Sequence, residues 1–133
     1  MIAARSMLFA AMLLIATSSL RADPRTDYLL HCSGCHLPDG TGHSPQVPTL
    51  HDVIGRLVAE PAGRSYIVRV PGASQVPIDD KRLTELVNWI LTEFNSDTLP
   101  ENFRLLTERE VKRARDEVLA DPARYRAENF PDY

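Results

Sequence analysis

The clearest periodic pattern in the chain is a stripe of large apolar residues that recurs every three or four positions between residues 79 and 94. This spacing places the apolar side chains on one face of an α-helix. Asp79 or Asp80 stands where a carboxylate can cap the first turn. The stripe is wide enough to be buried against two other elements. Its members are Leu83, Leu86, Val87, Ile90, Leu91 and Phe94.

A second helix is predicted to run into the two cysteines of the chain. Asp23 is a suitable N-cap, and Pro24 suits the first helical position because an N–H there would have no helical partner. Helical spacing predicts that Tyr28, Leu29 and Cys32 face inward.

Two further apolar segments, residues 50–60 and 63–70, predict short helices. Pro61 ends the first of them and Pro71 ends the second. The second segment is rich in valine and isoleucine and also suits a strand, but nothing else in the chain offers a strand to pair with it. Residues 37–48 have the glycine, proline and aspartate content of a loop.

The C-terminal part predicts one more helix, over residues 107–120, which begins with a capping box of Thr107 and Glu110. Asp121 and Pro122 then start a last short turn. We expect a solvated charged helix held by a few apolar residues; a strap on the preceding domain and a docking element are the alternatives. The expected anchors are Leu105, Val111 and Val118.

The first 22 residues are typical of a secretory signal peptide, because a basic residue precedes an apolar run over residues 7–16 and a small residue ends the segment. The run is short for a bilayer span, so the chain would meet a membrane only if this segment were retained as an anchor. Without Arg5 and Arg21, residues 23–133 have 13 basic and 18 acidic side chains and a formal charge of −5. This excess of acid argues against nucleic-acid binding, which depends on basic side chains that neutralise phosphates.

Both cysteines of the chain stand in the sequence CSGCH, residues 32–36. C-x-x-C-H is the pattern of covalent haem attachment. Two thiols about one helical turn apart can meet the two vinyl groups of one haem, and the next imidazole can bind its iron. A zinc site would need more thiols or imidazoles at ligand spacing. The remaining alternative is a disulfide between Cys32 and Cys35. It would close a loop too short to stabilise the fold much, so it would be a redox-active disulfide.

The sequence therefore predicts one haem c, covalently bound through Cys32 and Cys35, with His36 as the proximal iron ligand. An exported protein suits this prediction, because attachment of this kind follows translocation.

Residues 23–95 resemble the class I monohaem cytochromes c. The resemblance is carried by the short helix entering CSGCH, the DGTG loop, the Pro48-Thr49-Leu50 segment and the LVNWIL segment. It implies an all-α fold in which residues 23–96 form a small helical domain around one covalently bound haem. Residues 97–133 lie outside the match and are expected to form a C-terminal helical extension.

The resemblance also implies contacts around the cofactor. The carbonyl of Pro48 is expected to accept a hydrogen bond from His36, which would orient the imidazole and raise its basicity. Trp89 and Leu86 are expected to pack against Tyr28 near the haem edge.

The sixth iron ligand departs from the family pattern. Class I cytochromes usually supply a methionine from the loop before the final helix, but residues 70–80 contain none, and Met1, Met7 and Met12 all lie in the predicted signal peptide. A His/Met electron carrier is therefore excluded if that peptide is removed. His51 is the first candidate for a replacement ligand.

Other polar side chains have expected places near the haem. His43 is the second candidate ligand, although it and His51 also suit ordinary surface or hydrogen-bonded histidines. His31 is expected at the exposed haem edge. Gln75 could hydrogen-bond a distal water, and Arg69 could meet a propionate through its guanidinium fork.

Two functions of different class follow from the sixth position. If a protein nitrogen fills it, the chain is a periplasmic electron carrier that serves a larger redox protein, such as a dehydrogenase or an oxidase. If it is open, the protein binds small ligands or reacts with peroxide. Electron transfer is favoured, because no distal histidine with an acid or base partner is visible. A docking module for a larger dehydrogenase, with the tail as its contact surface, is a third possibility.

Overall fold

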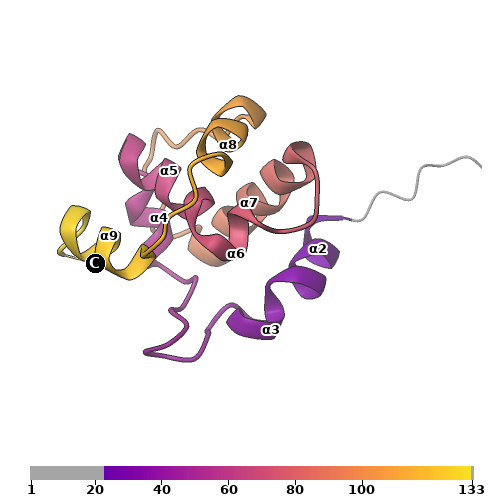
Figure 1. Ribbon diagram of the computed structural model, residues 1–133, viewed down its shortest axis with the longest axis horizontal. Coiled ribbons are helices and arrows are strands. Elements are labelled where there is room, and N and C mark those ends of the chain that lie inside the picture. Colours follow the sequence, from indigo (N-terminus) through magenta and orange to yellow (C-terminus); the bar gives the residue numbers. More distant parts are fainter. Residues whose placement is uncertain (1–22, 133) are drawn as a thin grey trace, which may run out of the picture.

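The structure is a computed structural model that describes residues 23–132 (Figure 1). Within this range the chain is helical apart from an isolated bridge between His43 and Val47, which confirms the predicted all-α class. The predicted signal peptide, residues 1–22, lies outside the described residues. The helices are α2 (Pro24–His31), α3 (Ser33–His36), α4 (Val53–Leu57), α5 (Pro61–Arg69), α6 (Pro71–Ser74), α7 (Asp80–Asn95), α8 (Glu108–Arg115) and α9 (Pro122–Asn129).

Helix α2 begins as predicted, because the Asp23 carboxylate accepts a hydrogen bond of 3.0 Å from the backbone N–H of Thr26. Tyr28 is fully buried and Cys32 is half-buried, as their spacing predicts. The inward orientation predicted for Leu29 is wrong, since this residue is 40% exposed. Helix α2 packs mainly on α7 and α3.

Helix α7 is the central helix, and it contacts α2, α4 and α8. Its Asp79 cap accepts a hydrogen bond of 2.8 Å from the backbone N–H of Arg82. The predicted apolar stripe faces the core. Leu83, Leu86, Val87 and Leu91 are buried, and Ile90 and Phe94 are half-buried against them.

The contact between α2 and α7 combines aromatic packing with an ion pair. The rings of Tyr28 and Trp89 lie 5.4 Å apart between centroids, so the pair implied by the family resemblance is present. Beside it, the buried carboxylate of Asp27 accepts two hydrogen bonds from Arg82, of 3.1 Å from Nε and 2.5 Å from Nη2. A bidentate pair of this kind fixes both distance and orientation.

The predicted helix over residues 50–60 is shorter than expected, because α4 covers only Val53–Leu57. Pro61 opens α5 instead of only ending the helix before it, which suits a residue without an N–H. The close approach of α5 to the end of α4 needs Gly63, because a Cβ there would collide with the backbone carbonyl of Leu57.

The C-terminal extension packs onto the rest of the chain and shares one hydrophobic core with it. The predicted capping box of Thr107 and Glu110 opens α8, and Val111 is fully buried as predicted. The predicted anchors Leu105 and Val118 are wrong, since they are 56% and 44% exposed.

The residues next to the two wrong anchors are buried in their place. Leu106 and Leu119 are 3% and 7% exposed. The side-chain amide of Asn88 holds Leu106 by donating to its carbonyl at 2.9 Å and accepting from its N–H at 2.8 Å. Helix α8 ends at Arg115 instead of residue 120. Among the described residues, no helix has the length and apolarity needed to cross a bilayer.

Candidate functional site

The two cysteines and His36 lie on one helical turn. The backbone N–H groups of Cys35 and His36 both donate to the carbonyl of Cys32, at 3.1 and 2.9 Å. Both thiols are free, Cys32 half-buried and Cys35 exposed. The motif thus presents two thiols one turn apart, followed directly by an imidazole.

A hydrogen bond at Nδ1 fixes the orientation of the His36 ring. Its Nδ1 lies 3.0 Å from the carbonyl oxygen of Pro48, which is the partner that the family resemblance implies. No residue in the range 23–132 hydrogen-bonds its Nε2. Burial lowers the pKa of His36, although the hydrogen bond to Pro48 opposes this shift. The ring is therefore held neutral, the state in which an imidazole binds a metal.

The turn after His36 is held by Tyr28. The Tyr28 hydroxyl donates to the carbonyl of Leu37 at 2.6 Å, and Leu37 has a positive φ of 61°. A leucine adopts this conformation only when its surroundings enforce it. Desolvation, followed by the charges of Cys32 and Asp39, raises the pKa of Tyr28 to about 12, so it remains a donor at neutral pH.

Gly42 allows the loop to close on His36. Its N–H donates to the His36 carbonyl at 3.0 Å, and its φ is +69°. A Cβ at this position would lie 2.6 Å from the Val47 carbonyl oxygen and 2.7 Å from that of Pro48. The loop therefore needs glycine at the place where it meets the acceptor of the His36 hydrogen bond.

The Cys32 thiol is protonated at neutral pH. Desolvation by burial raises its pKa to about 11, with smaller contributions from Asp27 and Cys35. Cysteines that attack disulfides have lowered pKa values, because the thiolate is the nucleophile. The environment of Cys32 therefore makes this thiol a poor nucleophile.

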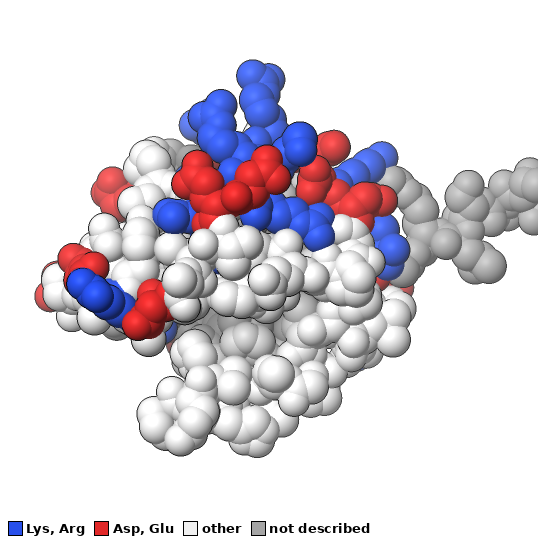
Figure 2. Space-filling model, viewed as in Figure 1, with Lys and Arg blue, Asp and Glu red and all other residues white. Residues whose placement is uncertain are grey.

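On one face of the molecule, the surface around the motif is uncharged. Figure 2 shows charged side chains over α8 and α9, whereas the part around α3 and residues 37–50 is uncharged on this face and hollowed in its middle. We call this feature the hollow between residues 37–50 and α6. Elsewhere in the molecule, Leu50, Val70 and Trp89 are half-buried apolar residues that pack against the core.

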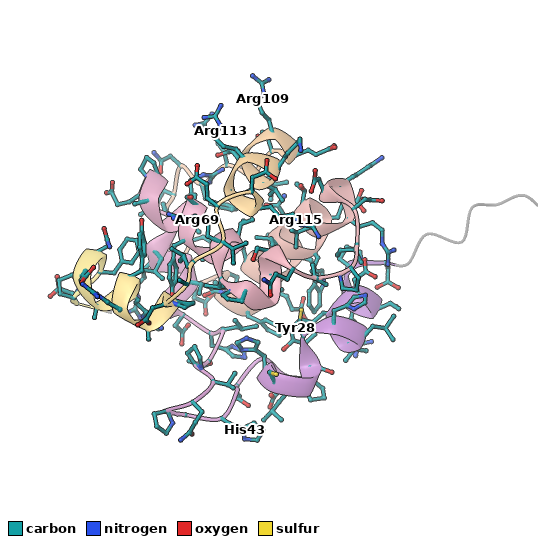
Figure 3. The ribbon with its side chains drawn as sticks, viewed as in Figure 1. Tyr28, His43, Arg69, Arg109, Arg113 and Arg115 are labelled. Atoms are coloured by element: carbon teal, nitrogen blue, oxygen red, sulfur yellow. The ribbon has the colours of Figure 1, made fainter. Side chains whose placement is uncertain are left out.

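The candidates for the sixth ligand are spread apart. His51 has its Nε2 2.5 Å from the carbonyl oxygen of Asp39, and its ring packs on Phe94 at 4.9 Å between centroids. Its Nε2 would have to leave this hydrogen bond to bind an iron. His43 and His31 are exposed, and Figure 3 shows His43 at the outer end of the loop, away from the helices.

The loop before α7 offers no strong iron ligand. Its Ser74 hydroxyl already donates to the Val70 carbonyl at 3.1 Å, and Gln75 is exposed. Arg69, expected near a propionate, is engaged elsewhere. Its Nε donates to the carbonyl of Glu117 at 2.8 Å, and its guanidinium lies 5.1 Å from the ring centroid of Tyr125.

Other kinds of site are weakly supported. Within residues 23–132, no three side chains of His, Cys, Asp or Glu gather as a metal site would require. A depression of about 340 Å³ lies between α5 and α8, far from the motif in Figure 1, and it is open and lined by paired charges such as Arg64 and Glu110. An open depression with several charged side chains in its lining would enclose little of a small ligand.

Sequence reasoning missed the groups that hold this site in place. The glycine-rich loop is a signal for Gly42. The ion pair of Asp27 with Arg82 joins residues 55 positions apart, and the contacts of Arg115 with the segment before α7 span 35 to 41 positions, so no local pattern signals them.

No protein-family model, no curated protein and no solved structure matches this chain. Its function is therefore inferred from its own residues and their geometry.

Proposed function

We propose that this protein is an exported monohaem c-type cytochrome that transfers electrons to or from a larger redox partner. The observation that carries the proposal is the orientation of His36. Its Nδ1 is bonded to Pro48 and its Nε2 is free, directly after two free thiols on the same helical turn. This is the arrangement needed to bind an iron inside a covalently attached haem.

The residues of the motif have distinct roles in this proposal. The thiols of Cys32 and Cys35 would each add across one vinyl group, the sulfur bonding to one carbon and the thiol hydrogen to the other, so that no oxidant is needed. His36 would bind the iron as the proximal ligand. Pro48 would keep that imidazole in its orientation, and the uncharged hollow would exclude water from the ring.

When bound, the haem would supply a one-electron couple. The protein would tune that couple through the hydrogen bond of His36 to Pro48 and through the low polarity of the surrounding surface. Electron transfer needs no enclosed substrate pocket, and the depression between α5 and α8 is open to solvent.

A second candidate is the binding of a small ligand at an open sixth position. It is favoured by the engagement of His51 with Asp39 and by the lack of a thioether or imidazole in residues 70–80. The two candidates share the haem and differ only in what reaches its distal side.

The test is to produce the full chain in a host that attaches haem c and to measure haem that survives acid–acetone extraction. Wild type and Ser33→Ala should retain the haem, whereas Cys32→Ala/Cys35→Ala should lose it. Ser33 is the matched control, because it lies in the same motif and its hydroxyl only donates to the Leu29 carbonyl. A folded wild-type chain free of haem, isolated from such a host, would disprove the proposal.

The absorption spectrum of the reduced holoprotein with carbon monoxide separates the two candidates. We expect a slow or absent change for the electron carrier. A Soret shift that is complete on mixing would favour the ligand-binding protein.

A further inference from the structure

Arg115, the last residue of α8, binds the segment between α6 and α7. Its guanidinium donates to three backbone carbonyls: from Nε to Ser74 at 2.8 Å, from Nη2 to Val76 at 2.5 Å and from Nη1 to Ile78 at 2.8 Å. Nη1 also donates to the Asp80 carboxylate at 3.0 Å. The side chain is only 19% exposed. Guanidinium groups suit this role, because their donors form a planar fork.

The segment has few other restraints. The backbone N–H groups of residues 74–78 that bond to backbone reach only local carbonyls, at most four positions away. Among the described residues, Arg115 supplies every long-range hydrogen bond to residues 74–78. Its removal would leave three half-buried carbonyls without partners, which is more costly than losing exposed hydrogen bonds.

The clamped segment lies beside the hollow. Figure 2 shows the hollow, and in the same view in Figure 1 α6 lies above this region and α3 with residues 37–50 lies below it. Arg115 is drawn in Figure 3 between α8 and these elements, pointing into the molecule. The carbonyls of residues 74–78 are thus directed toward the C-terminal extension.

We propose that Arg115 is a positioning residue that fixes residues 74–80 beside the hollow and thereby restricts the entry of small ligands to the haem iron. This inference rests on the proposed haem. It gives the C-terminal extension a role at the site: a chain without a distal methionine keeps its iron for electron transfer by holding the neighbouring segment closed.

The chain provides a matched control on the same helix. Arg113 is exposed, has no ion-pair or hydrogen-bond partner among the described residues, and points away from the body of the molecule in Figure 3. Arg113→Ala removes the same charge and side chain from α8 without touching the clamp.

The experiment compares wild-type holoprotein with Arg115→Ala, Arg115→Lys and Arg113→Ala. Amide hydrogen exchange measures the backbone of residues 74–80, and stopped-flow mixing measures the association rate of carbon monoxide with the reduced protein. In Arg115→Ala we expect exchange in this segment to rise about tenfold or more, since hydrogen bonds to a charged group are lost. The association rate should rise several-fold.

Arg115→Lys keeps the charge near Asp80 but has no planar fork for three carbonyls, so it should behave like the alanine variant in exchange. It also serves as the test if Arg115→Ala does not fold. Arg113→Ala should match wild type in both measurements.

Unchanged exchange in residues 74–80 would overturn the clamp. Faster exchange with an unchanged association rate would overturn the restriction of ligand entry and leave the electron carrier intact. A wild-type chain without covalent haem would instead disprove the proposed function, and the exchange measurement on that chain would still test the clamp.

Discussion

Two regions of this small protein are built in different ways. The motif side, residues 31–51, has a single buried residue, Gly40. The second region, which we call the extension side, is formed by α5, α7, α8 and residues 104–119. It has fully buried side chains such as Leu91 and Val111. Long-range arginine contacts also cross it. Arg64 donates to the carbonyls of residues 104 and 105 and to Glu110, and Arg115 holds the segment before α7.

The two sides differ in which interactions order them. The extension side buries enough apolar surface to be ordered by its own contacts. A residue that is ordered without being buried loses conformational entropy and gains no hydrophobic stabilisation. The motif side is ordered by polar contacts to its backbone from Tyr28, His36 and His51. A bulky apolar group in the hollow would supply the missing core.

The largest expected effect comes from uncoupling the two sides at α2. Asp27→Ala removes the buried carboxylate that receives both hydrogen bonds of Arg82. Breaking a buried pair is strongly destabilising, and Arg82 can hydrate in part because its side chain is 34% exposed. We expect a loss of about 3 kcal/mol in the free energy of unfolding, measured by urea denaturation.

The same variant should affect the two sides unequally. Amide exchange in Asp27→Ala should rise first in residues 31–51 and little in α5 and α8. Asp23→Ala is the control on the same helix, and it should have a smaller effect because its capping carboxylate is exposed. Equal loss of protection on both sides would contradict the division into two regions.

A smaller effect, confined to the motif side, is expected from Gly42→Ala. The positive φ and the close carbonyls of Val47 and Pro48 would force the loop to move, at about 2 kcal/mol. Displacement of the Pro48 carbonyl would weaken the hydrogen bond of His36, lower the basicity of the imidazole and raise the reduction potential of the proposed haem.

Gly72→Ala is the matched control for this change, because nothing lies within 4 Å of a Cβ at Gly72 and it belongs to α6. It should leave both the stability and the potential near wild-type values. A potential that does not move in Gly42→Ala would show that the Pro48 contact has no influence on the haem.

Much of the helical framework can be predicted from the sequence, because its signals are local. The caps at Asp23, Asp79 and Thr107 and the stripe of α7 are patterns within a few residues. Two predicted anchors of the extension are one residue out of register. Burial of Leu106 in place of Leu105 depends on Asn88, which lies 18 positions away.

The residue types of the candidate site can be predicted from the sequence, but the side-chain contacts around the site are harder to predict. The CSGCH sequence identifies Cys32, Cys35 and His36 without any structure. The placement of His51 against Asp39 and the engagement of Arg69 by Glu117 depend on how the loop and the extension fold back. Side-chain partners of this kind have no periodic signal, so they cannot be read from spacing.

The smallest expected effect is a pH dependence of stability that arises from Glu110 on the extension side. Burial opposes ionisation of Glu110, but hydrogen bonds from Thr107 and Arg64 outweigh it and lower the pKa of this carboxyl below 4.5. Between that lowered pKa and 4.5 the unfolded chain binds more protons than the folded one, so the stabilisation is complete above pH 4.5 and is lost as the pH falls through the folded pKa. Because the side chain is 44% exposed, solvent screening limits the contribution to less than about 1 kcal/mol.

Thermal unfolding of wild type and Glu110→Gln between pH 6 and about 3 measures this contribution, with Glu108→Gln as the control from the same turn of α8. The difference between wild type and Glu110→Gln should shrink as the pH falls, and exchange in residues 31–51 should be unaffected; a difference that grows on acidification would contradict a lowered pKa for Glu110.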